Sequence, residues 1–186
     1  MYNFVGALQP ERFSELDTLI SESIAEERYP EWVYHITVPH QLARDKISYQ
    51  RTEGAHAPDA VLSELRGDCE DNTALLCSMY AALGLRTAIY TIDSPSSERH
   101  CIALVKPPVD SIEYACDLLL LYYHDRLGFE PDAIGIDGTE LGEMLVVGST
   151  MTDYVGDIQS LARNGYIEIR EADRWVWRDL VDSGVY

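Results

Sequence analysis

Lysine is scarce in this sequence. Of its 186 residues 14 are basic, but only Lys46 and Lys106 are lysines, against 32 acidic residues and a net charge of −18. Binding to nucleic acid through phosphate neutralisation needs clustered lysine and arginine, so the composition disfavours this function. The acidic residues are dispersed along the chain, which indicates a solvated acidic surface. Such a surface repels itself, and near-molar salt, where the Debye length is about 3 Å, largely removes that penalty.

Long hydrophobic runs are also missing. No run approaches the roughly 18 consecutive apolar residues of a membrane-spanning helix, and the chain as given does not open on a basic segment followed by an apolar one. High acid content with little lysine resembles the composition of proteins from salt-accumulating organisms, notably haloarchaea and their viruses. We therefore expect a halophilic protein that is cytoplasmic or associated with a virion, without a membrane span.

The four cysteines, at positions 69, 77, 101 and 116, form neither a CxxC pair nor a zinc-ligand pattern. Nothing in the sequence calls for a metal ion or another cofactor. Cys77 falls in an apolar stretch and is expected to be a small buried hydrophobe. A disulfide between Cys101 and Cys116 is conceivable if their strands pair, although disulfides are rare in proteins that are not exported.

The segment Gly67-Asp68-Cys69-Glu70-Asp71 predicts the start of a helix. Its two outer aspartates have the reciprocal spacing of a capping box, with Asp in place of the usual Glu. Apolar residues at three- and four-residue steps then predict a helix over 69–83, which Gly84 would end in a left-handed cap. Cys69 therefore falls in the first helical turn, where free N–H groups and the helix dipole favour a thiolate.

The surrounding segments predict an α+β domain in which this helix packs on an antiparallel sheet. An amphipathic helix is expected over 11–27, and residues 42–49 are expected to form a second helix or an entry segment, after Pro30 and Pro39. Strands are expected over 85–92, 100–106 and 112–121, with a turn at Pro107-Pro108 between the last two.

The C-terminal part of the sequence is harder to interpret. Asp137-Gly138 indicates a turn, and strands or short helices are expected at 144–147, 157–162, 166–170 and 175–177. Trp175 and Trp177 are expected in the core rather than at a binding surface. We divide the chain into an N-terminal helical segment (1–37), a core (38–126) and a C-terminal extension (127–186) to which the sequence assigns no chemistry.

Cys69, His100 and Asp117 occur in the order of a nucleophile, a general base and an orienting carboxylate. If the strands over 100–106 and 112–121 pair, His100 lies opposite the part of the next strand that contains Asp117. The backbone N–H of Cys69 would help to stabilise an oxyanion, and Tyr49, Gln50 or another polar side chain could add a second donor.

Other polar residues are expected to be structural. The remaining histidines show no ligand spacing and are expected on the surface or in packing: His35, His40, His56 and His124. Asp68, Glu70 and Asp71 could suggest a cation site, but no Asp-x-Asp-x-Asp-Gly loop accompanies them, and helix capping explains two of the three.

Several motifs together resemble a known family. They are Asp45–Tyr49, Pro58–Leu62, Arg66–Asp71 with Ala74–Leu76, and Ala81–Ala88. With them, residues of roughly 38–121 resemble a transglutaminase-like domain of the papain-like cysteine protease superfamily. The resemblance implies that the cysteine opens the core helix and that histidine and aspartate lie on successive strands packed against it. It gives Cys69, His100 and Asp117 the same three roles.

The sequence thus predicts a cysteine-dependent acyl-transfer enzyme, a thiol peptidase or amidase rather than a true transglutaminase, with a protein or peptide as substrate. The alternative is a non-catalytic structural or interaction module on the same fold, for example a component of a virion or its tail. In that case the protein would be incorporated into a larger assembly.

Overall fold

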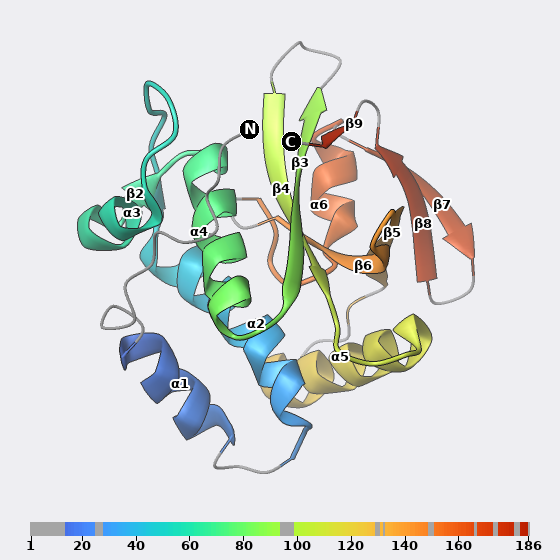
Figure 1. Ribbon diagram of the computed structural model, residues 1–186. Coiled ribbons are helices and arrows are strands. Elements are labelled where there is room, and N and C mark those ends of the chain that lie inside the picture. The colour runs from blue at the N-terminus through green and yellow to red at the C-terminus, as the bar shows by residue number, and fades with distance from the viewer. Residues whose placement is uncertain are drawn as a thin grey trace.

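The computed structural model describes residues 14–24, 28–93, 99–128, 131, 133–148 and 151–165, and the backbone of 167–172, 175–180 and 183–185. Figure 1 shows the elements in chain order: α1 (Ser14–Ile24), α2 (Glu31–Lys46), β1 (Ser48–Tyr49), α3 (Pro58–Glu64), β2 (Arg66–Gly67), α4 (Cys69–Ala82), β3 (Arg86–Asp93), β4 (Arg99–Lys106), α5 (Ile112–Leu127), β5 (Ile134–Thr139), β6 (Gly142–Val147), α6 (Ile158–Arg163), β7 (Ile167–Ala172), β8 (Trp175–Leu180) and β9 (Ser183–Val185).

One seven-stranded sheet organises the fold, in the order β7-β8-β5-β6-β4-β3-β9. Its neighbouring strands are antiparallel except β5 and β8, which are parallel. β1 and β2 form a separate parallel pair that brings the chain to the start of α4. The predicted α+β class is confirmed. Strands β5 to β9, from the segment treated as an extension, belong to the same sheet as β3 and β4.

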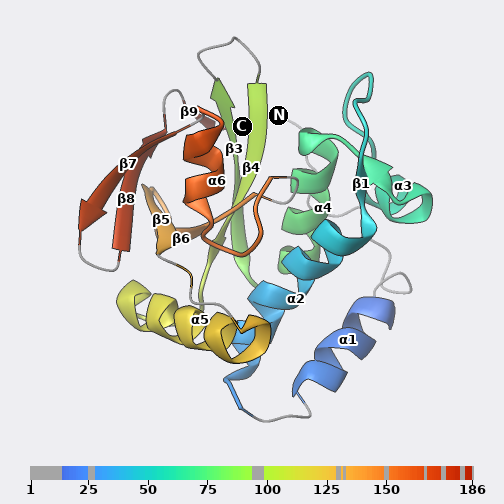
Figure 2. The ribbon, with the colours of Figure 1, turned by 180° about the vertical axis from the view of Figure 1, so that it is seen from behind.

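The sheet is covered on both faces. Along β4, Ala103 and Val105 pack in a core with residues of α2, α4 and α5. Ile102 and Leu104 point to the other face and pack in a second core with α6, which Figure 2 shows in front of the strands. α4 therefore packs on antiparallel strands, as predicted, and is buried over most of its length, from Asp71 to Tyr80.

The third predicted strand was wrong, because residues 112–121 belong to the helix α5. Ser111 caps this helix by accepting a hydrogen bond from the Tyr114 N–H at 3.1 Å, and Gly128, with φ 66°, ends it. β4 pairs instead with β3 and with β6. Figure 1 shows α5 at the end of the sheet opposite to the end where β3 finishes and β4 begins.

Two further local predictions need correction. α2 begins at Glu31 and runs through Pro39, whereas the second helix or entry segment was expected only after this proline, over 42–49. Burial of one helix face outweighs the hydrogen bond that a proline removes. Asp137 and Gly138 lie within β5, opposite Met144 and Glu143, and the turn follows at residues 140–141. The side chains of Trp175 and Trp177 lie outside the described part of the structure.

In the described residues, no helix is both long and apolar enough to cross a membrane. The net charge of −18 leads instead to a prediction about salt. We expect the midpoint of thermal unfolding to rise between about 0.01 M and about 1 M NaCl, because the Debye length falls from about 30 Å to about 3 Å. Circular dichroism would measure it. A constant midpoint, or an equal rise in sorbitol of matched osmolality, would contradict charge screening as the cause.

Candidate active site

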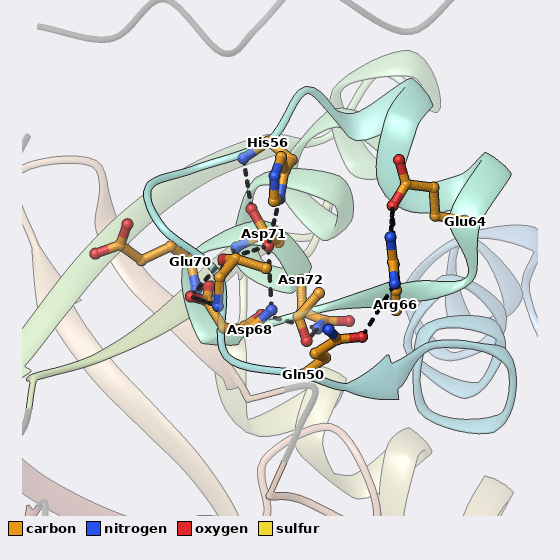
Figure 3. A network of polar contacts seen from close by, with 10 residues as sticks. Gln50, His56, Glu64, Arg66, Asp68, Glu70, Asp71 and Asn72 are labelled. Atoms are coloured by element: carbon orange, nitrogen blue, oxygen red, sulfur yellow. Dashed lines mark hydrogen bonds and ion pairs between the residues drawn. The ribbon is translucent and has the colours of Figure 1, made fainter.

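A capping box fixes the start of α4. The Asp68 carboxylate accepts hydrogen bonds from the N–H groups of Glu70 (2.9 Å) and Asp71 (3.3 Å), and the Asp71 carboxylate accepts one from the Asp68 N–H at 3.1 Å. Figure 3 shows these residues converging at the first turn. The predicted capping box is confirmed, and it places Cys69 as the first residue of the helix.

Asp71 also holds the preceding loop against the helix. Its fully buried carboxylate accepts hydrogen bonds from the His56 N–H (2.6 Å) and the Thr52 hydroxyl (3.0 Å). Burial by itself would raise the pKa of Asp71, but the backbone N–H groups of His56 and Asp68 hold this pKa below its ordinary value. Asp71 is therefore ionised and acts as the anchor of the loop over 50–56.

The structure brings Cys69 and His100 together. α4 begins at the end of the molecule where β4 also begins (Figure 1). The pKa of Cys69 is lowered to about 4, chiefly by a hydrogen bond with the Cys101 thiol. Burial opposes this, whereas a hydrogen bond with the His100 side chain, the Cys101 N–H and the charge of His100 add to it. These contacts therefore favour the thiolate form of Cys69.

The contacts of the Cys69 sulfur place it beside β4 rather than over one face of the sheet. Among the described residues, β6 pairs with β4 at Ala103, Leu104 and Val105. Cys101 precedes this paired segment, and its N–H donates to the Cys69 sulfur. Successive side chains of a strand point to opposite faces, so a sulfur that reaches both His100 and Cys101 lies beside the strand rather than over one face.

Cys101 is the residue of this site that the sequence did not reveal. Its buried thiol lies 3.6 Å from the Thr91 hydroxyl and shares a hydrogen bond with Cys69. The hydrogen bond with Cys69 and burial raise its pKa well above the ordinary range. The one signal in the sequence was its position next to His100 in a strand.

Asp117 does not lie on a strand beside His100. It is exposed on α5, which follows the opposite end of β4. The six residue-to-residue steps from His100 to Lys106 span about 20 Å of strand. The contact with His100 that we expected depended on pairing between β4 and a strand at 112–121, and α5 removes that basis. The conceivable disulfide between Cys101 and Cys116 depended on the same pairing, and all four cysteines are free thiols.

The other predicted residues have structural surroundings. Cys77 is buried, as predicted, and burial raises its pKa to about 12. His40 is buried against the Thr152 hydroxyl at 3.0 Å, and burial lowers its pKa to about 4. The carboxamide oxygen of Gln50, proposed as a second oxyanion donor group, accepts a hydrogen bond from Arg66 at 3.4 Å. Among the described residues, no three His, Cys, Asp or Glu side chains are placed to share a metal ion.

Comparison with known proteins yields distant structural similarities. No family model matches the chain, and no curated protein matches it. Its structure is similar to Legionella pneumophila LapG, with 12% identity over 97% of this chain and 86% of that one and a TM-score of 0.46. An EGTA-treated form of the same protein gives 13% identity, 98% and 87% coverage, and a TM-score of 0.48.

A Cytophaga hutchinsonii protein described as a "putative cysteine protease" is also similar, with 15% identity and a TM-score of 0.36. The similarity covers 56% of this chain and 38% of that one, so the chain spans well under half the length of that protein. All these TM-scores lie below 0.5.

Proposed function

We propose that the protein is a cysteine-dependent acyl-transfer enzyme, a thiol peptidase or amidase, in which Cys69 is the nucleophile and His100 the general acid and base. The observation that carries the proposal is the position of Cys69 as the first residue of α4 beside His100, where hydrogen bonds with Cys101 and His100 lower the pKa of the thiol. Thiolate, rather than thiol, is the reactive form of cysteine, and a lowered pKa next to a histidine is the usual arrangement of a nucleophilic cysteine.

In the proposed reaction the Cys69 sulfur attacks the carbonyl carbon of an amide in a protein or peptide. The tetrahedral intermediate collapses when His100 gives a proton to the departing amine, which leaves a thioester on Cys69. His100 then takes a proton from water, and the resulting hydroxide releases the acid and frees Cys69. An amine in place of water would give a transferase product from the same thioester.

The start of α4 supports charge development in this reaction. The N–H groups of Glu70 and Asp71 are taken by the Asp68 carboxylate, so we assign the oxyanion to the Cys69 N–H and to the positive end of the helix. Asp68 and Asp71 are then positioning residues: their hydrogen bonds hold the first turn of α4, from which Cys69 projects.

A generic acyl donor tests the proposal. Incubation with p-nitrophenyl acetate should produce a burst of nitrophenol and a protein acetylated on Cys69 as a hydroxylamine-sensitive thioester, detected by mass spectrometry of peptides. Cys69→Ser should lose the burst and the adduct. Cys77→Ser is the matched control, because Cys77 is buried and lies further along the same helix, and it should retain both.

The outcome separates the two functions that the sequence left open. Acylation of Cys69 that turns over with water or an added amine supports the enzyme. Equal nitrophenol release by wild type and Cys69→Ser would overturn it and would favour the non-catalytic module. Circular dichroism of both variants would verify that they fold.

A further inference from the structure

We propose that Cys69 and Cys101 form a reversible intramolecular disulfide under peroxide, which would switch the thiol at this site off. The two side chains are hydrogen-bonded to each other, and they come from different elements, the first turn of α4 and the third residue of β4. Both are free thiols in the described structure. The regulatory meaning of this bond rests on the proposed function, but its formation does not.

The two thiols have complementary surroundings. Cys69 is partly exposed, so a small oxidant can reach it, whereas Cys101 is only 8% exposed. Cys69 carries the negative charge of the pair, and thiolate is the form that peroxides oxidise. Cys69 is therefore the site of first attack, and Cys101 is the neighbouring thiol that can resolve the product without itself meeting solvent.

The reaction balances with hydrogen peroxide as the oxidant. The Cys69 thiolate attacks one peroxide oxygen, the O–O bond breaks, hydroxide leaves and takes up a proton, and Cys69 becomes a sulfenic acid. The Cys101 sulfur then attacks the Cys69 sulfur. The S–S bond forms, the S–O bond breaks, and the departing hydroxide takes the Cys101 proton as water. Two sulfurs are oxidised to a disulfide, and one peroxide is reduced to two waters.

The first step prepares the second. The principal cause of the high pKa of Cys101 is its hydrogen bond with Cys69. A neutral sulfenic acid in place of the Cys69 thiolate removes the negative charge that opposes ionisation of Cys101. Oxidation of Cys69 thus makes Cys101 a better nucleophile at the moment when it is needed. Cys77 and Cys116 are buried, and burial raises the pKa of each, so neither provides a competing thiolate.

Peptide mapping tests the proposal directly. The full chain would be treated with equimolar hydrogen peroxide, alkylated under denaturing conditions and digested without reductant. We expect a linked peptide pair that contains Cys69 and Cys101, complete loss of iodoacetamide labelling at Cys69, and full recovery of that labelling with dithiothreitol. With excess peroxide, because each further oxidation step consumes another peroxide, Cys69 of Cys101→Ser should instead proceed to sulfinic acid, which dithiothreitol does not reverse, whereas the wild type should stop at the disulfide. Cys116→Ser, as the matched control, should behave as wild type.

Each outcome decides one question. Sulfinic acid on wild-type Cys69 at the rate seen in Cys101→Ser, or a disulfide between other positions or between two chains, would overturn the proposal. The wild-type map stands even where Cys101→Ser does not fold. A Cys69–Cys101 disulfide in a protein that p-nitrophenyl acetate does not acylate would retain the redox pair and reject the enzyme. Acylation without the disulfide would do the reverse.

Discussion

Replacing His100 with alanine is expected to raise the pKa of the Cys69 thiol by about 1–3 units, because both a hydrogen bond and a favourable charge are lost. Starting from a pKa of about 4, a rise to about 7 would lower the thiolate fraction at pH 5 by roughly a hundredfold. The hydrogen bonds with Cys101 and the start of α4 remain, so the pKa should stay below the ordinary value of about 8.5.

The measurement is the rate of iodoacetamide labelling at Cys69 against pH, read by mass spectrometry of the labelled peptide. The midpoint of the pH profile reports the pKa, independently of changes in intrinsic nucleophilicity. His124→Ala is the matched control, since His124 is exposed on α5, and it should leave the midpoint unchanged. An unchanged midpoint in His100→Ala would show that His100 does not act on this thiol.

The same profile decides the role of Asp117. The structure places Asp117 on the exposed surface of α5, and we expect Asp117→Asn to reproduce the wild-type midpoint. A shift as large as that of His100→Ala would instead restore Asp117 as the partner of His100 and would contradict the arrangement described here.

Asp71→Ala is expected to lower the free energy of unfolding by about 3 kcal/mol. The substitution leaves the His56 N–H and the Asp68 N–H without the acceptor they share, in a place where the carboxylate is fully buried, whereas the Thr52 hydroxyl keeps the Asp68 carboxylate as its acceptor at 2.7 Å. Urea unfolding followed by tryptophan fluorescence would measure the loss. Asp117→Ala removes an exposed carboxylate and should change the free energy by less than about 0.5 kcal/mol.

The stability difference should depend on pH with a defined sign. The folded-state pKa of Asp71 lies below its unfolded value, so its contribution is complete above the unfolded pKa of about 3.9 and is lost as the pH falls through the folded value. The difference in the free energy of unfolding between wild type and Asp71→Ala should therefore be constant near neutral pH and become smaller below about pH 4. A gap that widens in acid would contradict the anchoring role.

The start of the site was predictable because its signals are local. A capping box, a helical apolar period and a terminal glycine all lie within 18 residues of one another, from Gly67 to Gly84, and each is satisfied by neighbours in the chain. The strand that carries His100 was equally local. The local signals therefore assign Cys69 to a helix start and His100 to a strand, as the structure has them.

The errors arose where local signals were ambiguous or were overridden. The apolar run over 118–121 suits a strand or a buried helix equally well, and the deciding features, Ser111 as a cap and Gly128 as a stop, lie outside it. Asp137-Gly138 is a strong turn signal, yet pairing with β6 extends β5 through it. The contact between Cys69 and Cys101 depends on how a helix meets the edge of a strand, and no periodicity in the sequence encodes that.

The outer side of β3 is closed by β9, which pairs with Tyr90, Thr91 and Ile92. During synthesis on the ribosome, the hairpin that carries His100 and Cys101 emerges long before residues 183–185. Until then its outer edge presents unpaired N–H and C=O groups to any other nascent chain. Expression yield should therefore depend on the β9 segment, and variants truncated before residue 183 should aggregate through this edge.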